Sequence, residues 1–193
     1  MYSIFENMNE CSELEVARLF PLVSEQRRLQ ALRYTHTFGR YCSLKSYEIL
    51  LELYNEWSGE QHDLLPDFLY NEHGAPYWTD RPYFSISHCK QGIAVAISEQ
   101  PIGIDIEAIR PLNEGLVQKA MNTQEQALIQ AAANPALEFI RLWTRKEAYV
   151  KMLGTGINSD MHEILRDTQP VIWTEFFSED KGYICTICKK DIQ

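Results

Sequence analysis

Apolar residues recur at helical spacing through the first third of the chain. This pattern predicts short helices over residues 12–20 and from Ser24 onward, followed by a longer helix over residues 38–54. Ser24 stands where a capping serine accepts a backbone N–H at the start of a helix. The run Asn71-Glu72-His73-Gly74-Ala75-Pro76 interrupts the pattern and predicts a turn.

From Tyr83 onward the period of the pattern changes to two. The alternation predicts strands over residues 83–88, 93–97 and 102–107, with turns at Lys90-Gln91-Gly92 and Glu99-Gln100-Pro101. Because short turns join these strands in sequence, we expect them to form an antiparallel meander.

Helices and strands recur in the second half. Residues 123–126 predict a helix that opens with a capping box, and Asn134-Pro135 ends it. A longer helix should cover residues 136–153 and end at Gly154, followed by strands over 171–177 and 183–189. Each half therefore contains helices and strands of its own, which is typical of an α+β fold.

Size and charge limit the classes of function. The chain has 193 residues, of which 45% are hydrophobic, so it can build a sizeable core as one domain or as two packed lobes. Its formal net charge of −9 argues against general binding to nucleic acid, which requires a surplus of lysine and arginine. An anionic ligand must therefore meet a local basic pocket.

The same survey predicts a cytoplasmic protein without a membrane span. No apolar run approaches the ~20 residues that cross a bilayer, and the first residues lack the pattern of a signal peptide. The five cysteines are scattered, which suits a reducing compartment. Cys185 and Cys188 should point to opposite faces of one strand, so we expect no zinc site there.

Two carboxylates lie on one face of the strand 102–107. Ile102, Ile104 and Ile106 should pack inward, and Gly103, Asp105 and Glu107 should point the other way. Asp105 and Glu107 would then lie about 7 Å apart, where a hard divalent cation such as Mg²⁺ would remove their repulsion. The alternative is the solvated outer face of a half-buried strand. Gly103 could leave space for a ligand.

A second group of polar residues lies in the helix 136–153. Trp143, Glu147 and Lys151 fall at i, i+4 and i+8 and form one stripe. Glu147 could supply a further metal ligand and Lys151 a cation for phosphate. The alternative is an ordinary surface ion pair between these two residues, although the tryptophan favours a partly buried face.

Ser87 and His88 are a third candidate. Adjacent residues of a strand point to opposite faces, so they cannot form a serine–histidine nucleophile pair by themselves. His88 should share a face with Phe84 and Ile86. At a strand end it is either structural or able to contact a phosphate or accept a proton.

Taken together, these segments resemble the Sfp-type 4′-phosphopantetheinyl transferases. The resemblance spans roughly residues 24–157 and rests on four motifs: Gly74-Ala75-Pro76, Phe84-Ser85-Ile86-Ser87-His88, residues 102–107 and residues 143–151. It implies a pseudo-dimer of two similar α+β lobes, residues 1–100 and 101–193, each a small antiparallel sheet with packed helices, and an active site in the cleft between them. It also implies a monomer, since the shorter relatives are trimers.

The resemblance implies transfer of the phosphopantetheine arm of coenzyme A to a serine of an acyl or peptidyl carrier protein, with release of adenosine 3′,5′-bisphosphate. Breaking a pyrophosphate requires charge neutralisation, which Mg²⁺ supplies. By resemblance Asp105, Glu107 and Glu147 hold the metal. Glu147 or a metal-bound water takes the serine proton, and Lys151 steadies the phosphate. Coenzyme A would contact Arg27 or Arg28, Gly74, Pro76, Ser87 and His88, together with Asp105 and Lys151.

The chain departs from the family pattern at two positions. Ala75 replaces the usual lysine of the first motif, and Ser85 replaces the usual asparagine of the second, which suggests altered nucleotide contacts. A non-catalytic module that binds coenzyme A or a carrier is therefore an alternative, and another metal-dependent phosphoryl enzyme such as a pyrophosphatase is a third. Carrier docking would use a local patch that we place at Arg110, Leu116, Val117, Lys119 and Met121.

Overall fold

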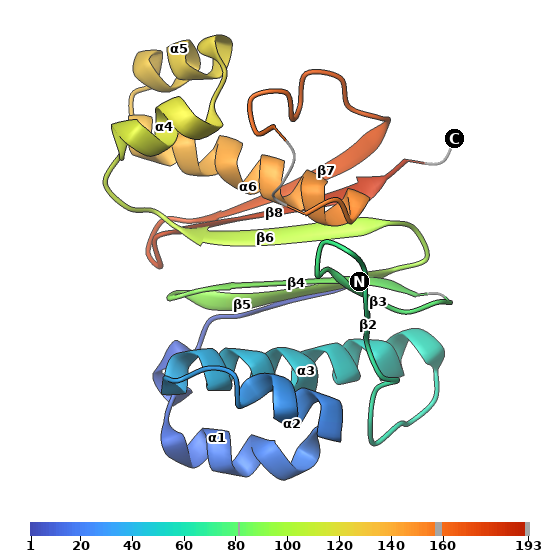
Figure 1. Cartoon of the computed structure of the whole chain (residues 1–193). Coiled ribbons are helices and arrows are strands. Elements are labelled where there is room, and N and C mark those ends of the chain that lie inside the picture. Colours follow the sequence, from blue (N-terminus) through green and yellow to red (C-terminus); the bar gives the residue numbers. More distant parts are fainter. Residues whose placement is uncertain (81, 157–159, 192–193) are drawn as a thin grey trace.

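Two three-stranded antiparallel sheets lie at the centre of the molecule, and helices cover their outer faces (Figure 1). The structure is a computed structural model that describes residues 1–80, 82–156 and 160–191. The strand order is β1-β5-β4 in the first sheet and β6-β8-β7 in the second, and β2 and β3 form a separate hairpin. The mixed architecture with small antiparallel sheets agrees with the predicted α+β class.

The strands are β1 (Tyr2–Phe5), β2 (Leu69–Tyr70), β3 (Pro76–Tyr77), β4 (Tyr83–Cys89), β5 (Gly92–Ser98), β6 (Ile102–Ala108), β7 (Val171–Ser178) and β8 (Tyr183–Lys190). The helices are α1 (Glu13–Leu19), α2 (Glu25–Ala31), α3 (Thr37–Ser58), α4 (Glu114–Ala120), α5 (Thr123–Ala131) and α6 (Pro135–Leu153), with short 3₁₀ turns at Met8–Glu10 and Phe20–Leu22.

Helix ends follow the capping signals of the sequence. The side chains of Ser12 and Ser24 accept backbone N–H groups at the starts of α1 and α2. Helices α3 and α6 end at Gly59 and Gly154, both in the left-handed conformation that glycine adopts without strain. The predicted helices of the first third and the predicted helix 136–153 are therefore confirmed.

The alternation of β6 separates two environments. Ile104 and Ile106 pack against Ala94 and Ala96 of β5, which places part of the core between the two sheets. On its other face β6 packs against α6, and Gly103 allows this close approach because a Cβ there would overlap the carbonyl oxygen of Ala148. Gly103 therefore makes room for a helix, and the interpretation of this glycine as space for a ligand was wrong.

The predicted meander was right for its first two strands, since β4 and β5 pair antiparallel, and wrong for its third. Strand β5 pairs with β4 on one side and with β1 on the other, so both of its edges are occupied. Strand β6 instead pairs with β8 in the second sheet. The period of a strand predicts which face is buried, but it does not specify the neighbour to which the strand is hydrogen-bonded.

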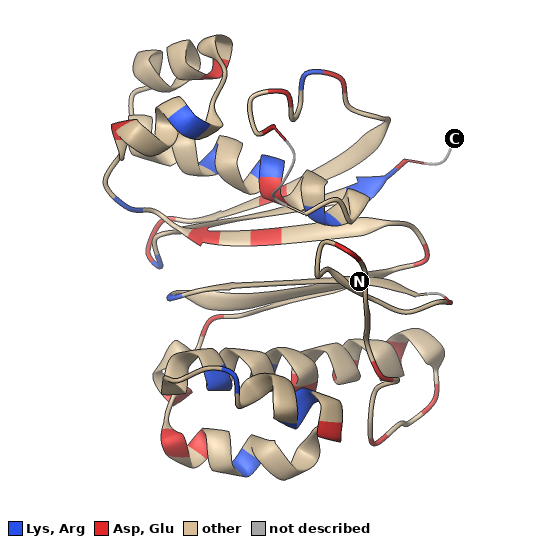
Figure 2. Cartoon of the chain, viewed as in Figure 1, with Lys and Arg blue, Asp and Glu red and all other residues tan. Residues whose placement is uncertain are grey.

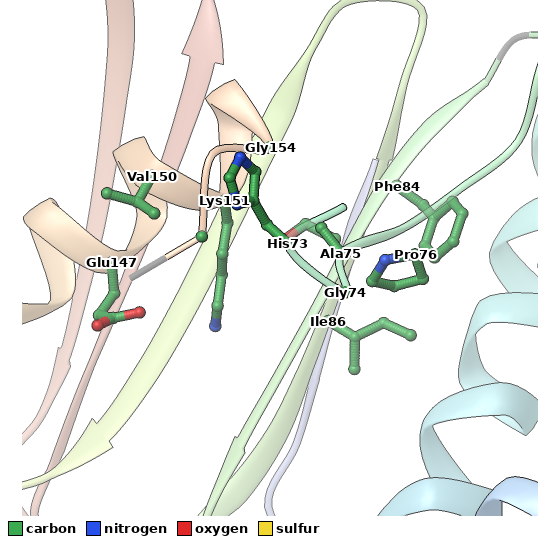
Figure 3. A pocket seen from close by; sticks show the side chains of 12 residues that line it. His73, Gly74, Ala75, Pro76, Phe84, Ile86, Glu147, Val150, Lys151 and Gly154 are labelled. Carbon is green, nitrogen blue, oxygen red and sulfur yellow. The ribbon is translucent and has the colours of Figure 1, made fainter. Parts of the chain in front are cut away.

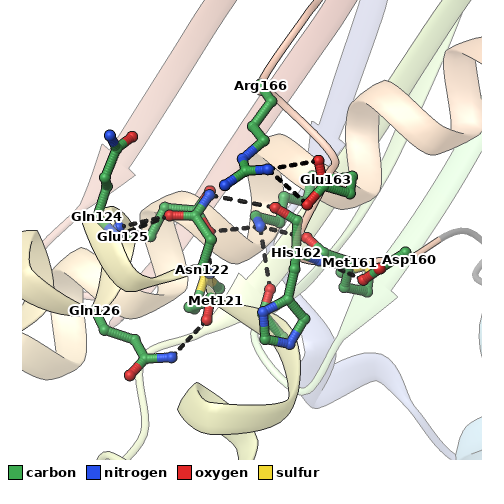
Figure 4. Close-up of polar contacts among 12 residues, drawn as sticks. Met121, Asn122, Gln124, Glu125, Gln126, Asp160, Met161, His162, Glu163 and Arg166 are labelled. Atoms are coloured by element: carbon green, nitrogen blue, oxygen red, sulfur yellow. Dashed lines mark hydrogen bonds and ion pairs between the residues drawn. The ribbon is translucent and has the colours of Figure 1, made fainter.

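A buried polar network fastens α4 and α5 to α6. Asn122 is the N-cap of α5 and forms a capping box with Glu125, so the box begins one residue before the predicted Thr123 (Figure 4). Lys146 of α6 is fully buried and donates to Glu125 Oε2 at 2.7 Å and to the carbonyl oxygens of Ala120 and Met161. Three donors meet three acceptors, so this lysine is fully satisfied.

The docking patch predicted around α4 is partly buried in the structure. Helix α4 was not predicted, and it turns Val117 into the core, where this side chain is 4% exposed. Met121 is fully buried in the same cluster. These two side chains hold α4 against α6 and cannot meet a partner without unfolding.

Two further expectations concern helices and cysteines. Among the described helices, none is both long enough and apolar enough to cross a membrane. Cys185 packs with the isoleucines between the sheets, whereas Cys188 packs on the opposite face of β8 with Ala148 and Tyr149. The prediction that these cysteines face opposite sides of one strand is confirmed.

Candidate active site

The site lies where α6 crosses β6. In the upper half of the molecule the acidic positions of β6 lie beside the charged stretch of α6 (Figure 2). Since Gly103 faces α6, Asp105 lies on the same face of the strand and meets Lys151 of α6. The one-face arrangement of Gly103 and Asp105 predicted from the alternation is therefore observed.

Asp105 is buried and firmly held. It is 4% exposed, which overturns the alternative of a solvated outer face. Its Oδ1 accepts hydrogen bonds from Ser87 Oγ and from Lys151 Nζ, both at 2.7 Å. One oxygen of the carboxylate is thus fixed, and the other, the buried Oδ2, has no hydrogen-bond partner among the described residues.

Glu147 is a second buried carboxylate with a free oxygen. It is 7% exposed, and its buried Oε1 has no hydrogen-bond partner in the described part of the chain. Burial, followed by the negative charge of Asp105, raises the pKa of Glu147 to about 7, although Lys151 opposes the shift. Burial and Asp105 also raise the pKa of the half-buried Glu107, against the opposing charge of Arg110.

Lys151 lies between the carboxylates and an open cavity. Its Nζ donates to Asp105 Oδ1 and, at 3.1 Å, to the carbonyl oxygen of Ile104. The cavity has a volume of about 450 Å³, and Figure 3 shows Glu147 and Lys151 on one wall with Pro76, Phe84 and Ile86 across from them. The site therefore combines a charged wall with an apolar one.

A second cavity of about 330 Å³ gathers the basic residues. Arg27, His88 and Lys151 line it, together with Gly74, Pro76 and Ser87. The guanidinium of Arg27 lies 4.7 Å from the ring centroid of Phe68 and donates to Ser43 Oγ at 3.4 Å. Burial lowers the pKa of Arg27, a group that remains charged at neutral pH. This is the local basic pocket that an acidic chain needs to bind an anion.

Arg28 lies elsewhere. Its Nη1 donates to the carbonyl oxygen of Val23 at 3.0 Å, and the residue does not line this cavity. The sequence left Arg27 and Arg28 as alternatives for contacting a phosphate of coenzyme A. In the structure only Arg27 lies with His88 and Lys151.

Ser87 and His88 point to opposite sides of β4, as the alternation predicts. Ser87 reaches Asp105, while the ring of His88 lies edge-on to Phe38, with 6.0 Å between ring centroids. His88 remains exposed, and its partial desolvation, followed by the charge of Lys151, lowers the pKa of the imidazole. A neutral ring at physiological pH can still donate a hydrogen bond or accept a proton.

Asn71 positions the turn between β2 and β3, a role that the sequence did not reveal. Its Oδ1 accepts from the N–H groups of His73 and Ala75, and its Nδ2 donates to the carbonyl oxygen of Gly154 at 2.6 Å. The turn is thereby fixed to the end of α6. Asparagine is common in turns, so this signal could have been found only as a local turn motif.

The residues fit a divalent cation, although the structure contains no preformed cluster of ligands. Within the described ranges, no group of three or more His, Cys, Asp or Glu side chains could hold a metal ion. Two buried carboxylates nevertheless have an unpartnered oxygen, on Asp105 and Glu147, and they repel each other. Mg²⁺ uses one or two protein carboxylates and takes its other ligands from water and phosphate, so this donor set suits it.

Comparison with known proteins finds similarity to the family that the motifs resemble. Residues 101–190 match the 4′-phosphopantetheinyl transferase superfamily. The 4′-phosphopantetheinyl transferase gsp of Aneurinibacillus migulanus is 29% identical and the match covers 86% of this chain and 76% of the relative. The transferase psf-1 of Bacillus pumilus is 26% identical, with 91% and 82% covered. Sfp of Bacillus subtilis (strain 168) is 23% identical, with 92% and 86% covered.

A solved structure is also similar in part. Holo-[acyl-carrier-protein] synthase of Thermotoga maritima is 16% identical, with a TM-score of 0.38, and the match covers 48% of this chain and 64% of that one. The three sequence relatives named above are each called a 4′-phosphopantetheinyl transferase. Over most of its length the chain is therefore similar to the Sfp-type 4′-phosphopantetheinyl transferases.

Proposed function

We propose that this chain transfers the 4′-phosphopantetheine arm of coenzyme A to a serine of an acyl or peptidyl carrier protein, and that the reaction depends on Mg²⁺. One observation carries the proposal. The basic cavity of Arg27, His88 and Lys151 adjoins the buried carboxylates Asp105 and Glu147, so phosphates and a proton acceptor would meet at Lys151.

The reaction exchanges one P–O bond for another. The serine oxygen of the carrier attacks the phosphorus that bears the pantetheine arm, and the P–O bond to adenosine 3′,5′-bisphosphate breaks. The serine proton goes to a carboxylate oxygen of Glu147. A carboxylate oxygen without a hydrogen-bond partner can take this proton, and Glu147 Oε1 is such an oxygen among the described residues.

The cations of the site bind the donor. Two N–H groups of Lys151 are used by Asp105 and Ile104, and its third can reach a phosphate oxygen. Arg27 and His88 would bind further phosphate oxygens in the basic cavity. Asp105, Glu107 and Glu147 would hold Mg²⁺, which supplies charge neutralisation on the pyrophosphate.

We also propose that residues 1–100 and 101–193 form two similar lobes with the active site between them. The proposed site lies where β4 and the β2–β3 hairpin of the first lobe meet β6 and α6 of the second. The monomeric state and the cytoplasmic location stay predictions.

Mass spectrometry of an apo carrier protein tests the function. Incubation with coenzyme A and Mg²⁺ should add the mass of one phosphopantetheine group to the carrier, and EDTA should prevent the addition. Acyl and peptidyl carriers should both be offered, since the sequence does not specify the pathway. Folded enzyme that modifies none of several carriers would contradict the proposal.

A further inference from the structure

Two buried serines join β4 to β6 at the level of Asp105. The two strands belong to different sheets, and among the described residues no backbone pairing connects them. Ser85 Oγ accepts the N–H of Ile104 at 3.0 Å, and Ser87 Oγ donates to Asp105 Oδ1 at 2.7 Å. Ser85 is 6% exposed and Ser87 is 9% exposed, so solvent cannot easily replace either bond.

The bonds form one network across three elements. The carbonyl oxygen of Ile104 accepts from Lys151 Nζ, and the same ammonium binds Asp105 Oδ1. The N–H and C=O of Ile104 are thus both bonded to side chains, one from β4 and one from α6. The backbone next to Asp105 is held from two sides.

The network leaves one defined oxygen free. Asp105 Oδ1 has two donors, whereas Oδ2 is buried without a partner in the described part of the chain. A carboxylate held at one oxygen keeps its orientation, so the other oxygen presents a lone pair in a fixed direction. Groups that orient a ligand in this way typically change metal affinity 10- to 100-fold when they are removed.

We propose that Ser85 and Ser87 are positioning residues that fix β6 and the Asp105 carboxylate for a divalent cation at Oδ2. The proposal rests on the function proposed above, in which Asp105 is a metal ligand. It also gives Ser85, where the family pattern has asparagine, a role in the protein scaffold: its hydroxyl is directed at the backbone of β6.

Binding of Mn²⁺ to the metal-free protein tests the proposal without any carrier or coenzyme A. Titration followed by electron paramagnetic resonance of free Mn²⁺ gives the affinity, and thermal unfolding gives the stability of each variant. Ser87→Ala should weaken binding about tenfold, and Ser85→Ala should weaken it to a similar extent. Ser87→Thr keeps a hydroxyl and should restore most of the affinity.

Thr144→Val is the matched control. Thr144 is fully buried, and its hydroxyl bonds to that of Thr186 at 2.8 Å between α6 and β8, so the variant also loses a buried bond between two elements. It should lose stability and keep its affinity for Mn²⁺. Normal affinity in both alanine variants, or an equal loss in Thr144→Val, would overturn the positioning role alone. A wild-type chain that binds no Mn²⁺ would overturn the metal assignment as well.

Discussion

Helix α6 carries two lysines that each pair with a carboxylate at 2.7 Å, and the two pairs have opposite characters. Lys146 meets Glu125 in a fully buried network, with every ammonium proton bonded. Lys151 meets Asp105 at the wall of two cavities, with its side chain 29% exposed and two acceptors. The distances are the same, so distance alone does not separate structure from function.

The difference lies in the atoms that remain unpaired. The Lys146 network uses its charges to hold α4, α5 and the turn at residues 160–163 in place. The Lys151 network leaves Asp105 Oδ2 and Glu147 Oε1 buried and without hydrogen-bond partners among the described residues. Unsatisfied buried oxygens destabilise a folded chain unless a ligand uses them. The second network therefore has acceptor capacity that the first lacks.

Glu147→Gln, in the Lys151 network, should have the largest effect on activity. The amide cannot accept the serine proton and is a poor ligand for a divalent cation, so the transfer rate should fall on the order of 10³-fold. Stability should be unchanged or higher, because the variant removes a repelling buried charge. Glu163→Gln, which changes an exposed carboxylate paired with Arg166, should keep full activity. Near-normal turnover in Glu147→Gln would remove this residue from the reaction.

Lys146→Met should have the reverse effect, a loss of stability with little change in activity. The variant leaves Glu125 buried beside an apolar side chain, and the loss of one partner of a buried pair costs about 3 kcal/mol or more. The midpoint of urea unfolding should fall accordingly. Transfer activity per folded molecule should stay within a few-fold of wild type, because Lys146 contacts neither cavity. Wild-type stability in this variant would mean that the Lys146 network contributes little to the free energy of unfolding.

Gly103→Ala tests whether the two networks can be separated. The new methyl group would push α6 away from β6 at Ala148, which costs about 2 kcal/mol or more by overpacking. Lys151 should lose its contacts with Ile104 and Asp105, while the Lys146–Glu125 pair lies on the other side of α6 and should persist. Amide hydrogen exchange should therefore rise along β6 and remain low at the start of α5. A uniform rise would show that the networks unfold together.

Much of this organisation can be predicted from the sequence, because it depends on local periodicity. The alternation places Gly103 and Asp105 on one face, and the helical stripe places Glu147 and Lys151 one turn apart. The pairing of β6 with β8 could not be predicted, since pairing depends on which distant strand offers a complementary edge. Strand β1 has only four residues and gave no signal of its own.

The burial of Lys146 could not be predicted from the sequence either, because it also depends on a residue in a distant element. Lysine is almost never fully buried unless it is paired, and the partner Glu125 lies 21 residues earlier in another helix. Neighbouring charged residues such as Arg145 make this part of α6 resemble a solvated surface. The unpaired oxygens of Asp105 and Glu147 were hidden in the same way, because satisfaction of a buried atom depends on all surrounding elements.

The pH dependence of stability should show the smallest effect and the sharpest contrast between the two networks. The pKa of Glu147 is raised from 4.5 to about 7 on folding, so the folded state holds this proton more tightly than the unfolded state. The resulting stability is present below the unfolded pKa and is lost as the pH rises through about 7. His88 acts in the opposite direction, because its pKa is lowered and its neutral form favours the folded state as the pH rises.

Thermal unfolding in EDTA between about pH 5 and about pH 8 measures the contribution of Glu147 to stability, as the difference between wild type and Glu147→Gln. The Tm of wild type should fall about 3 °C or more relative to Glu147→Gln over that range, and saturating Mg²⁺ should remove the difference by neutralising the carboxylates. Lys146→Met should start from a lower Tm and fall more steeply than wild type, since Glu125 is left buried without its cation and its charge opposes folding as the pH rises. If the slope of Tm against pH is the same in wild type and Glu147→Gln, other groups titrate in this range. The Lys151 network would then lack the predicted charge repulsion.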